Sequence, residues 1–183
     1  MSSWFSWTKL AKSASELDET SDQRGSLHPK SGQTSIDHLD RRILERVLQD
    51  GRVSFRQLAT ELHISTTTVA TRVARLQSSG IIRGYNALVD FQRLGYELTV
   101  VTEIHVSKGK LVEMEREIAK LPTVCAVYDV TGEIDAVVIS KCRNREELSH
   151  FTKSLLAMHF VERTNSHVVL TTVKEDFRLP IQT

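Results

Sequence analysis

The apolar residues between positions 36 and 48 recur at helical spacing. They are Ile36, Leu39, Ile43, Leu44, Val47 and Leu48. Ser35 stands where its side chain can cap the first turn, and Asp37 and Asp40 lie near the positive end of the helix dipole. Gly51 interrupts the pattern, so the spacing predicts a first helix that ends just before this glycine.

Two shorter helices are predicted to follow. Ser54 can cap one of them, and Ser65 can cap the other, which runs from Thr66 to about Ser79 and ends at Gly80. Their apolar stripes are Phe55, Leu58, Ala59 and Leu62 in the first, and Val69, Val73 and Leu76 in the second. Three short helices with tight connections form a helix-turn-helix unit, which we place at residues 36–85.

Beyond Gly80 the spacing of apolar residues changes to every second position. The alternation from Ile81 to Val89 predicts a β-strand that leaves the helices as a wing, with residues 86–96 as a hinge to the next domain. Further elements follow in the order strand, helix, strand, strand, helix, strand. They are Leu98–Val106, Leu111–Lys120, Val124–Thr131, Ile134–Lys141, Arg145–Ala157 and Arg163–Val173.

This order predicts a ferredoxin-like βαββαβ domain over residues 97–183, with a short C-terminal tail. The Gly132-Glu133 pair is predicted to make a tight hairpin turn that joins the two central strands. The expected fold class is therefore α+β, with an N-terminal winged helix-turn-helix and a C-terminal ferredoxin-like domain.

The first 35 residues differ from the rest of the chain. They are rich in Ser, Thr, Asp and Gly and have no sustained period, which predicts a mostly disordered extension. One short apolar cluster interrupts them, formed by Trp4, Phe5, Trp7 and Leu10. We interpret this cluster as a short helical turn or a non-native start, with a docking peptide for a partner as the alternative.

The composition is that of an ordinary globular protein. The 183 residues are 40% hydrophobic and 26% charged, no apolar run is long enough to cross a bilayer, and the start lacks the order of a signal peptide. We therefore expect a cytoplasmic protein without a membrane partner. Cys125 and Cys142 lie far apart and outside any Cys-x-x-Cys pattern, so we expect two buried free thiols and no metal site.

The net charge of +1 conceals an asymmetry along the chain. Residues 36–96 contain nine arginines and no lysine against six acidic residues, an excess of +3. The later residues carry a net charge of −2, and the first 35 carry none. Only the helix-turn-helix segment therefore favours a polyanion such as double-stranded DNA.

The third predicted helix is the candidate for DNA recognition. A helical wheel places Thr67, Thr71, Ala74 and Arg75 opposite the apolar stripe, with the other polar residues flanking them. We expect the hydroxyls to approach base edges or phosphates, Arg72 and Arg75 to reach guanine or the backbone, and three outlying arginines to contact phosphates. The predicted DNA-contacting set is Ser65, Thr66, Thr67, Thr68, Thr71, Arg72, Arg75, Arg52, Arg56 and Arg83. The alternative is a solvated helix face.

One such module buries too little surface for tight specific binding, so we expect a homodimer or higher homo-oligomer supplied by the second domain.

Together these motifs resemble the leucine-responsive regulatory protein (Lrp/AsnC) family. The similarity spans Ile36 to about Pro180 and rests on the order and spacing of short motifs. They are Leu39-Asp40-x-x-Ile43-Leu44, Asp50-Gly51-Arg52-Val53-Ser54, Leu58-Ala59, Ser65-x-x-x-Val69-x-x-Arg72-Val73-x-Arg75-Leu76, Gly80-Ile81-Ile82-x-Gly84-Tyr85, Leu94-Gly95, Leu121-Pro122-x-Val124 and Val130-Thr131-Gly132-x-x-Asp135. The resemblance implies a transcription regulator whose βαββαβ domains pair into dimers, tetramers or octamers that hold effectors at subunit interfaces.

The resemblance also implies a place for an amino-acid effector, around Thr131, Gly132 and Asp135. The backbone amides of the turn would hold a carboxylate and Asp135 an ammonium, with Thr164 and Ser166 as further polar candidates. Alternatively, Gly132 only makes the turn and Asp135 only caps it. The chain departs from the family at two places, with His159-Phe160 where Pro-Gly is common and Ala136 where an aromatic is common.

Two other functions are compatible with this architecture. Sirohaem decarboxylases resemble it, but the histidines of the second domain form no pattern such as His-x-x-x-His, so we expect no catalytic residue and no cofactor. These histidines are His105, His150, His159 and His167. The second alternative is an architectural DNA-binding protein that needs no effector.

Overall fold

The structure is a computed structural model that describes residues 35–107 and 109–181. The expected N-terminal extension and its aromatic cluster lie outside these residues, apart from Ser35. The described chain divides into a helical unit, residues 35–88 and 177–181, and a sheet unit, residues 89–176 without residue 108. None of the described helices is both long enough and apolar enough to span a membrane.

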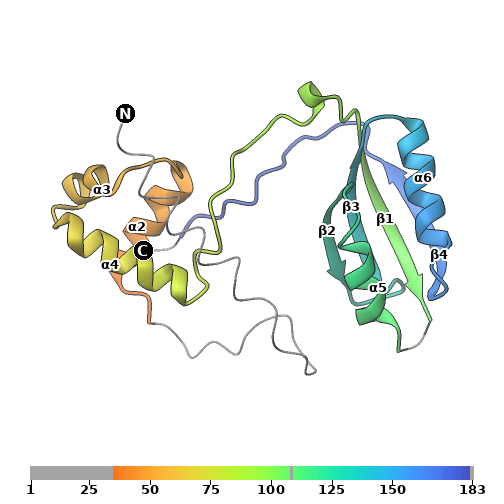
Figure 1. Ribbon diagram of the computed structural model, residues 1–183, viewed down its shortest axis with the longest axis horizontal. Coiled ribbons are helices and arrows are strands. Elements are labelled where there is room, and N and C mark those ends of the chain that lie inside the picture. The colour runs from red at the N-terminus through yellow and green to blue at the C-terminus, as the bar shows by residue number, and fades with distance from the viewer. Residues whose placement is uncertain (1–34, 108, 182–183) are drawn as a thin grey trace. The chain divides into compact units, whose positions relative to one another are not determined.

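The helical unit contains α2 (His38–Gln49), α3 (Phe55–Leu62) and α4 (Thr66–Ser78) (Figure 1). Ser54 and Ser65 cap α3 and α4 as predicted, since their hydroxyls accept backbone N–H bonds three residues later. The prediction that Ser35 caps α2 is wrong. Asp37 is the cap, because its carboxylate accepts from the Asp40 N–H at 2.8 Å while the Asp40 carboxylate accepts from the Asp37 N–H at 3.1 Å.

The predicted apolar stripes form the core of this unit. One residue in particular comes from far along the chain: Ile181, near the C-terminal end, packs against the core of the three helices. The fully buried side chains include Ile43, Leu58, Val69, Val73 and Leu76. Burial of these side chains supplies most of the free energy that holds three such short helices together.

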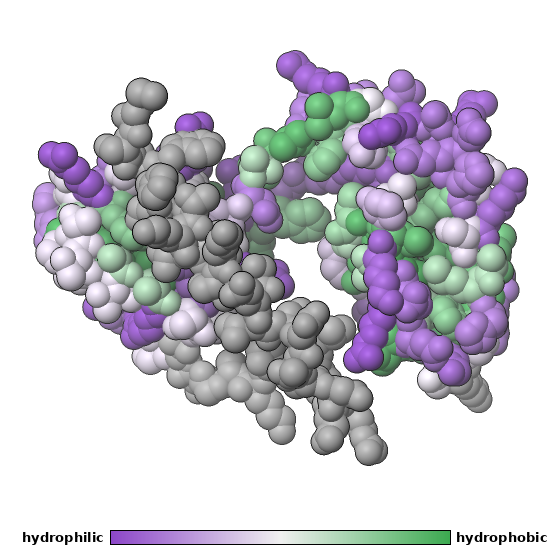
Figure 2. Space-filling view, in the orientation of Figure 1, coloured by the Kyte–Doolittle hydropathy of each residue, from purple (hydrophilic) through white to green (hydrophobic). Residues whose placement is uncertain are grey.

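The predicted strand over Ile81–Val89 is absent. The described residues between α4 and the first strand of the sheet unit contain only the short 3-10 helix η1 (Gln92–Leu94). A β-strand needs a neighbouring strand that hydrogen-bonds with its backbone N–H and C=O groups. No described segment of this chain pairs in this way with Ile81–Val89. Three of the apolar residues that suggested a strand, Ile81, Ile82 and Tyr85, pack on the helical core instead. Figure 2 shows hydrophobic surface next to hydrophilic residues around η1, and the exposed apolar residues of this segment are Leu88, Val89, Phe91 and Leu94.

The sheet unit has the predicted βαββαβ order. Its elements are β1 (Leu98–Val106), α5 (Leu111–Ile118), β2 (Val124–Asp129), β3 (Ala136–Cys142), α6 (Arg145–Leu156) and β4 (Val161–Val168). The strands form one antiparallel sheet in the order β2-β3-β1-β4. This is the ferredoxin-like arrangement, so the predicted fold class is confirmed.

Two details of the sheet prediction are wrong. β2 and β3 do form a hairpin, but β2 is an edge strand, because β3 pairs on its other side with β1. Cys125 is exposed, since it lies on this edge strand where the register with β3 shifts, whereas Cys142 is buried as expected.

The two faces of the sheet are unlike. α5 and α6 pack on one face, where Val100, Ile104 and Val138 are fully buried. The alternating residues of the same strands point to the other face, which neither α5 nor α6 covers. We call it the open face. Its apolar members include Val101, Val137, Ile139 and Tyr128. At one end of this face the Lys141 ammonium pairs with Glu175 at 3.1 Å and lies over the Phe91 ring.

Candidate nucleic-acid interface

Helix α4 presents an exposed polar face opposite its buried stripe. Val69, Val73 and Leu76 are completely buried in the core of the helical unit. The exposed residues on the other side of the helix are Thr66, Thr67, Thr71, Ala74, Arg75 and Ser78. Small side chains of this kind let a helix approach the edges of base pairs closely.

The hydroxyls at the start and on the exposed face of α4 differ in the hydrogen bonds that they already make. Ser65 and Thr68 bond to each other at 2.8 Å, and the Thr71 hydroxyl donates to the carbonyl oxygen of Thr67 at 3.0 Å. Among the described residues, the side chains of Thr66 and Thr67 have no hydrogen-bond partner. These two hydroxyls are therefore available to a ligand, and Thr71 retains its capacity to accept a hydrogen bond.

Arg72 and Arg75 do not extend freely from α4. The Arg72 Nη1 atom lies 2.9 Å from Asp40 Oδ1 and 2.5 Å from Asp37 Oδ2, and Arg75 Nη2 bonds to Asp40 Oδ2. The hydrogen bond from Arg72, followed by that from the Asp40 backbone, lowers the pKa of Asp37 to about 2. Asp37 and Asp40 in turn raise the pKa of Arg72. The four side chains form what we call the arginine clamp.

Sequence reasoning missed the clamp, because it assigned both aspartates only to the helix dipole. The pairs join residues 32 and 35 positions apart, which no local period can reveal. One signal was present: the aspartates and the arginines both stand three residues apart on their helices.

The three outlying arginines of the predicted set are free. Arg52, Arg56 and Arg83 are exposed and form no ion pair with any described residue. Arg46, in contrast, is bound to Glu61 at 2.8 Å. Unpaired guanidinium groups on the surface suit contacts with phosphate oxygens.

The candidate effector residues lie at the β2–β3 turn and on β4. Thr131 and Gly132 are exposed, and Gly132 has a φ of 126°, a backbone conformation that favours glycine. One oxygen of the Asp135 carboxylate accepts from the Val106 N–H at 2.8 Å and thereby ties the turn to the end of β1. Asp135 therefore has a structural role whether or not it binds an effector.

The two candidate effector residues on β4 lie away from this turn. On β1, Ile104 pairs with Ala136 of β3 on one side and with Thr164 of β4 on the other. Thr164 therefore lies two strands away from β3, near the end of the sheet where the β2–β3 turn lies. Ser166 bonds to the buried Thr102 at 3.0 Å. In a single chain, the structure places these residues near one end of the sheet but does not bring their side chains into contact with Asp135.

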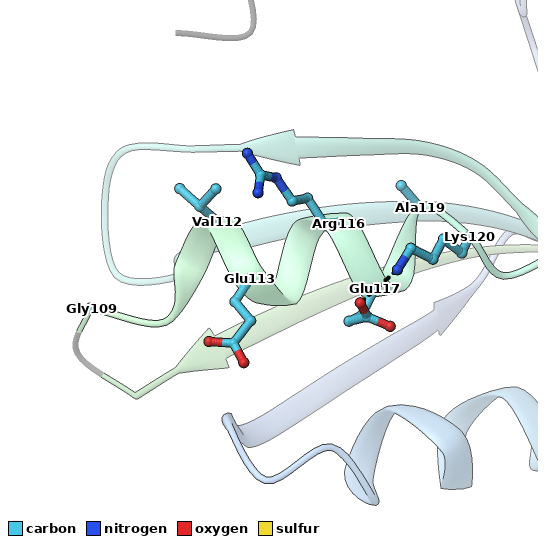
Figure 3. A pocket seen from close by; sticks show the side chains of 7 residues that line it. All are labelled: Gly109, Val112, Glu113, Arg116, Glu117, Ala119 and Lys120. Carbon is cyan, nitrogen blue, oxygen red and sulfur yellow. Dashed lines mark hydrogen bonds and ion pairs between the residues drawn. The ribbon is translucent and has the colours of Figure 1, made fainter. Parts of the chain in front are cut away.

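A shallow hollow of the sheet unit lies elsewhere, along the outer side of α5 (Figure 3). It is open, and its charged side chains point outward along the helix rather than toward a common centre. Glu113 pairs with Lys110, the N-cap residue of α5, and Glu117 pairs with Lys120, just beyond the end of the helix, each at 2.7 Å. None of the candidate effector residues lines it.

The histidines of the sheet unit do not form a metal centre within the described residues. His105 contacts Arg163 at 2.8 Å on the open face, and His167 lies 3.6 Å from Glu103 on the same face. His159 packs edge-on against Phe160.

Comparisons with known proteins agree with both units. Residues 36–83 match the model of the winged helix-turn-helix DNA-binding family, and residues 99–179 match that of the Lrp/AsnC ligand binding domain. The chain is 46% identical over 144 residues to an uncharacterized HTH-type transcriptional regulator of Pyrococcus horikoshii, an alignment that covers 79% of this chain and 97% of that protein.

Two solved structures share the fold and were determined with L-methionine. One is a transcriptional regulator of Neisseria meningitidis, with a TM-score of 0.73, 26% identity, and coverage of 80% of this chain and 97% of that one. The other is the feast or famine regulatory protein of Mycobacterium tuberculosis, with a TM-score of 0.72, 25% identity, and coverage of 80% and 99%. The chain belongs to the Lrp/AsnC family of helix-turn-helix transcription regulators.

Proposed function

We propose that this regulator binds double-stranded DNA as a homodimer, with α4 of each copy in a major groove, and that an amino acid modulates the binding. The observation that carries the DNA-binding part is the exposed hydroxyl-rich face of α4, in a unit that also carries three exposed arginines without an ion pair to any described residue. Thr66, Thr67 and Thr71 approach base edges, while Ser65 and Thr68 fix the start of the helix beside the backbone. Arg52, Arg56 and Arg83 contact phosphates.

Support for a homodimer comes from the open face of the sheet. Half-buried apolar side chains of the three strands β1, β2 and β3 lie on it, with Tyr128 exposed among them. An uncovered apolar sheet face is costly in water, and a second copy of the same face covers it with the same residues. A single helix-turn-helix also gains specificity when a dimer presents two helices to two half-sites.

Support for an amino-acid effector comes from the two relatives determined with L-methionine. The Gly132 turn offers exposed backbone to a carboxylate, and one carboxylate oxygen of Asp135 accepts no hydrogen bond from a described residue. The separation between this turn and β4 in one chain favours an effector site that is completed at a subunit interface. We assign the chain no catalytic role, since His105 and His167 make pairwise contacts on the open face. A regulator that binds DNA acts where the DNA is, which supports a cytoplasmic location.

The experiment that tests DNA binding is selection of bound fragments from a random DNA pool. We expect the wild-type protein to enrich a palindrome with two half-sites about one helical turn, roughly 34 Å, apart. A Thr67→Glu variant places a carboxylate on the exposed face of α4 and should lose the enrichment. The matched control is Thr171→Glu, an exposed position of the sheet unit, which should keep it. No enrichment by the wild-type protein at modest salt would overturn the proposal.

The effector is tested by thermal unfolding with each amino acid in turn. A ligand present at about 100 times its dissociation constant stabilises the folded state by about 2.7 kcal/mol. An absence of any shift across the full set would favour the effector-free architectural alternative.

A further inference from the structure

Asp40 is the centre of the arginine clamp and is completely buried. Each of its two carboxylate oxygens accepts hydrogen bonds from different groups. Oδ1 accepts from Arg72 at 2.9 Å. Oδ2 accepts from Arg75 and also from the Asp37 N–H, the latter at 3.1 Å. Asp40 is thus both the third residue of α2, where it completes the capping box, and the anchor for two side chains of α4.

A buried carboxylate depends on its partners. Removing a cation from a buried pair leaves an uncompensated charge in a medium of low polarity, which is strongly unfavourable. If Arg72 and Arg75 both left the clamp for DNA, Asp40 would remain buried with only one backbone N–H to stabilise its charge. Arg52, Arg56 and Arg83 face no such cost, because none of them forms an ion pair with a described residue.

The charges of the clamp also cancel. Two aspartates face two arginines, so the clamp contributes little net attraction to a polyanion. The lowered pKa of Asp37 and the raised pKa of Arg72 both indicate that the charged forms are held together in the folded protein.

The position of the clamp on α4 matters for recognition. Arg72 and Arg75 stand three residues apart and join one side of α4 to the first turn of α2. Two anchors at this spacing fix the rotation of α4 about its own axis, and the buried stripe alone fixes it less tightly. With that rotation set, Thr67, Thr71 and Ala74 face outward.

We propose that Arg72 and Arg75 are positioning residues for DNA recognition that act through Asp40, and that the Thr67, Thr71 and Ala74 face reads the bases. This inference rests on the proposed DNA-binding function. It assigns the two arginines a different role from Arg83, although all three belong to the same short segment.

The salt dependence of DNA binding separates the two roles. Each phosphate contact that is lost flattens the slope of log K against log salt by about 0.9. We compare the wild-type protein with Arg75→Gln and with Arg83→Gln, on the selected palindrome and on random DNA. Arg83→Gln should flatten the slope by about 0.9 on both DNAs. Arg75→Gln should leave the slope unchanged but weaken binding to the palindrome at least about 10-fold, with the preference reduced at every base pair together.

Two further variants guard against a trivial loss of folding. Arg75→Lys keeps a cation beside Asp40 but cannot make a bidentate contact with guanine, so it should bind within about 3-fold of the wild-type protein. In a double-mutant cycle, Asp40→Asn combined with Arg75→Gln should weaken binding to the palindrome no more than Asp40→Asn alone. Circular dichroism confirms that each variant is folded before binding is measured.

Three results would overturn the inference while the proposed function stands: a flattened slope for Arg75→Gln, a loss of preference confined to one base pair, or losses in the cycle that add. If the wild-type protein bound no DNA, the proposed function would fail and the inference with it.

Discussion

The helical unit and the sheet unit differ in how completely they bury their apolar residues. The stripes of α2, α3 and α4 pack against one another and bury Leu58, Val69 and Leu76 completely. The sheet unit packs both its helices on one face of its sheet, so the residues that alternate with the buried ones remain on the open face. The helical unit is therefore complete as a packing unit, whereas the sheet unit leaves apolar side chains on its second face, where we propose that a second copy packs.

The largest effect is expected from a cavity in the closed core. Leu76→Ala removes a fully buried side chain of α4 and should lower the free energy of unfolding of the helical unit by about 2–5 kcal/mol. Leu88→Ala is the matched control, because Leu88 is 78% exposed, and it should change this free energy by less than about 0.5 kcal/mol. The measurement is hydrogen exchange of the α4 amides. Equal effects of the two changes would contradict the claim that the helical core is closed.

A charge on the open face should have the next largest effect. Ile139→Glu places a carboxylate where the second copy is proposed to pack, and it should raise the dissociation constant of the dimer at least about 100-fold, or about 2.8 kcal/mol. Sedimentation velocity measures this shift.

The control for this change lies on the opposite side of the sheet unit. Leu156→Glu alters an exposed residue of α6 and should leave the oligomeric state unchanged. A dimer that survives Ile139→Glu but dissociates with Leu156→Glu would move the interface from the open face to the helices.

The same comparison explains what the sequence could predict. The helices and the βαββαβ order follow from apolar spacing, because each stripe is local to its element. The strand expected over Ile81–Val89 was wrong, since Ile81, Ile82 and Tyr85 pack on the helices and no described strand pairs with this segment. Burial of the Tyr85 hydroxyl, which raises the pKa of this residue to about 12, is the result of that packing.

The candidate site was predicted in part. The exposed threonines of α4 follow from a helical wheel, because the wheel needs only the local period. The partners of Arg72 and Arg75 lie in α2, more than 30 positions earlier, so no local pattern could show that these arginines are engaged. The exposure of Cys125 was missed for a similar reason, because the order of strands decides which strand is at the edge.

A pH titration gives a smaller effect, confined to the helical unit. The pKa of Asp37 falls from its ordinary value of 3.8 to about 2 in the folded protein, chiefly through its bond with Arg72. Because the folded value is the lower one, the Asp37 contribution to stability is complete above about pH 4 and is lost as the pH falls toward 2. Relative to the intrinsic exchange rate at each pH, hydrogen exchange of the α2 and α4 amides should therefore accelerate over this range.

Asp37→Asn tests the cause of this acceleration. Asparagine still caps a helix but does not titrate, so the variant should show a smaller change between pH 4 and pH 2. Asp90→Asn, a change of an exposed acid in the sheet unit, should leave the pH dependence of the helical unit as it is in the wild-type protein. An unaltered profile in Asp37→Asn would assign the pH dependence to other carboxylates.

The smallest effect concerns thiol chemistry and distinguishes the covered face of the sheet from its β2 edge without changing stability. Cys142 is fully buried under the helices, and burial raises the pKa of its thiol, whereas Cys125 is exposed on β2. Since the thiolate is the reactive form, a disulfide reagent should modify one thiol per chain in the folded protein and the second only after unfolding. Cys125→Ser should abolish the fast reaction. If both thiols reacted equally fast, α5 and α6 would cover the face that contains Cys142 only loosely. If Cys125 reacted fast only in the Ile139→Glu variant, the dimer would also cover the β2 edge.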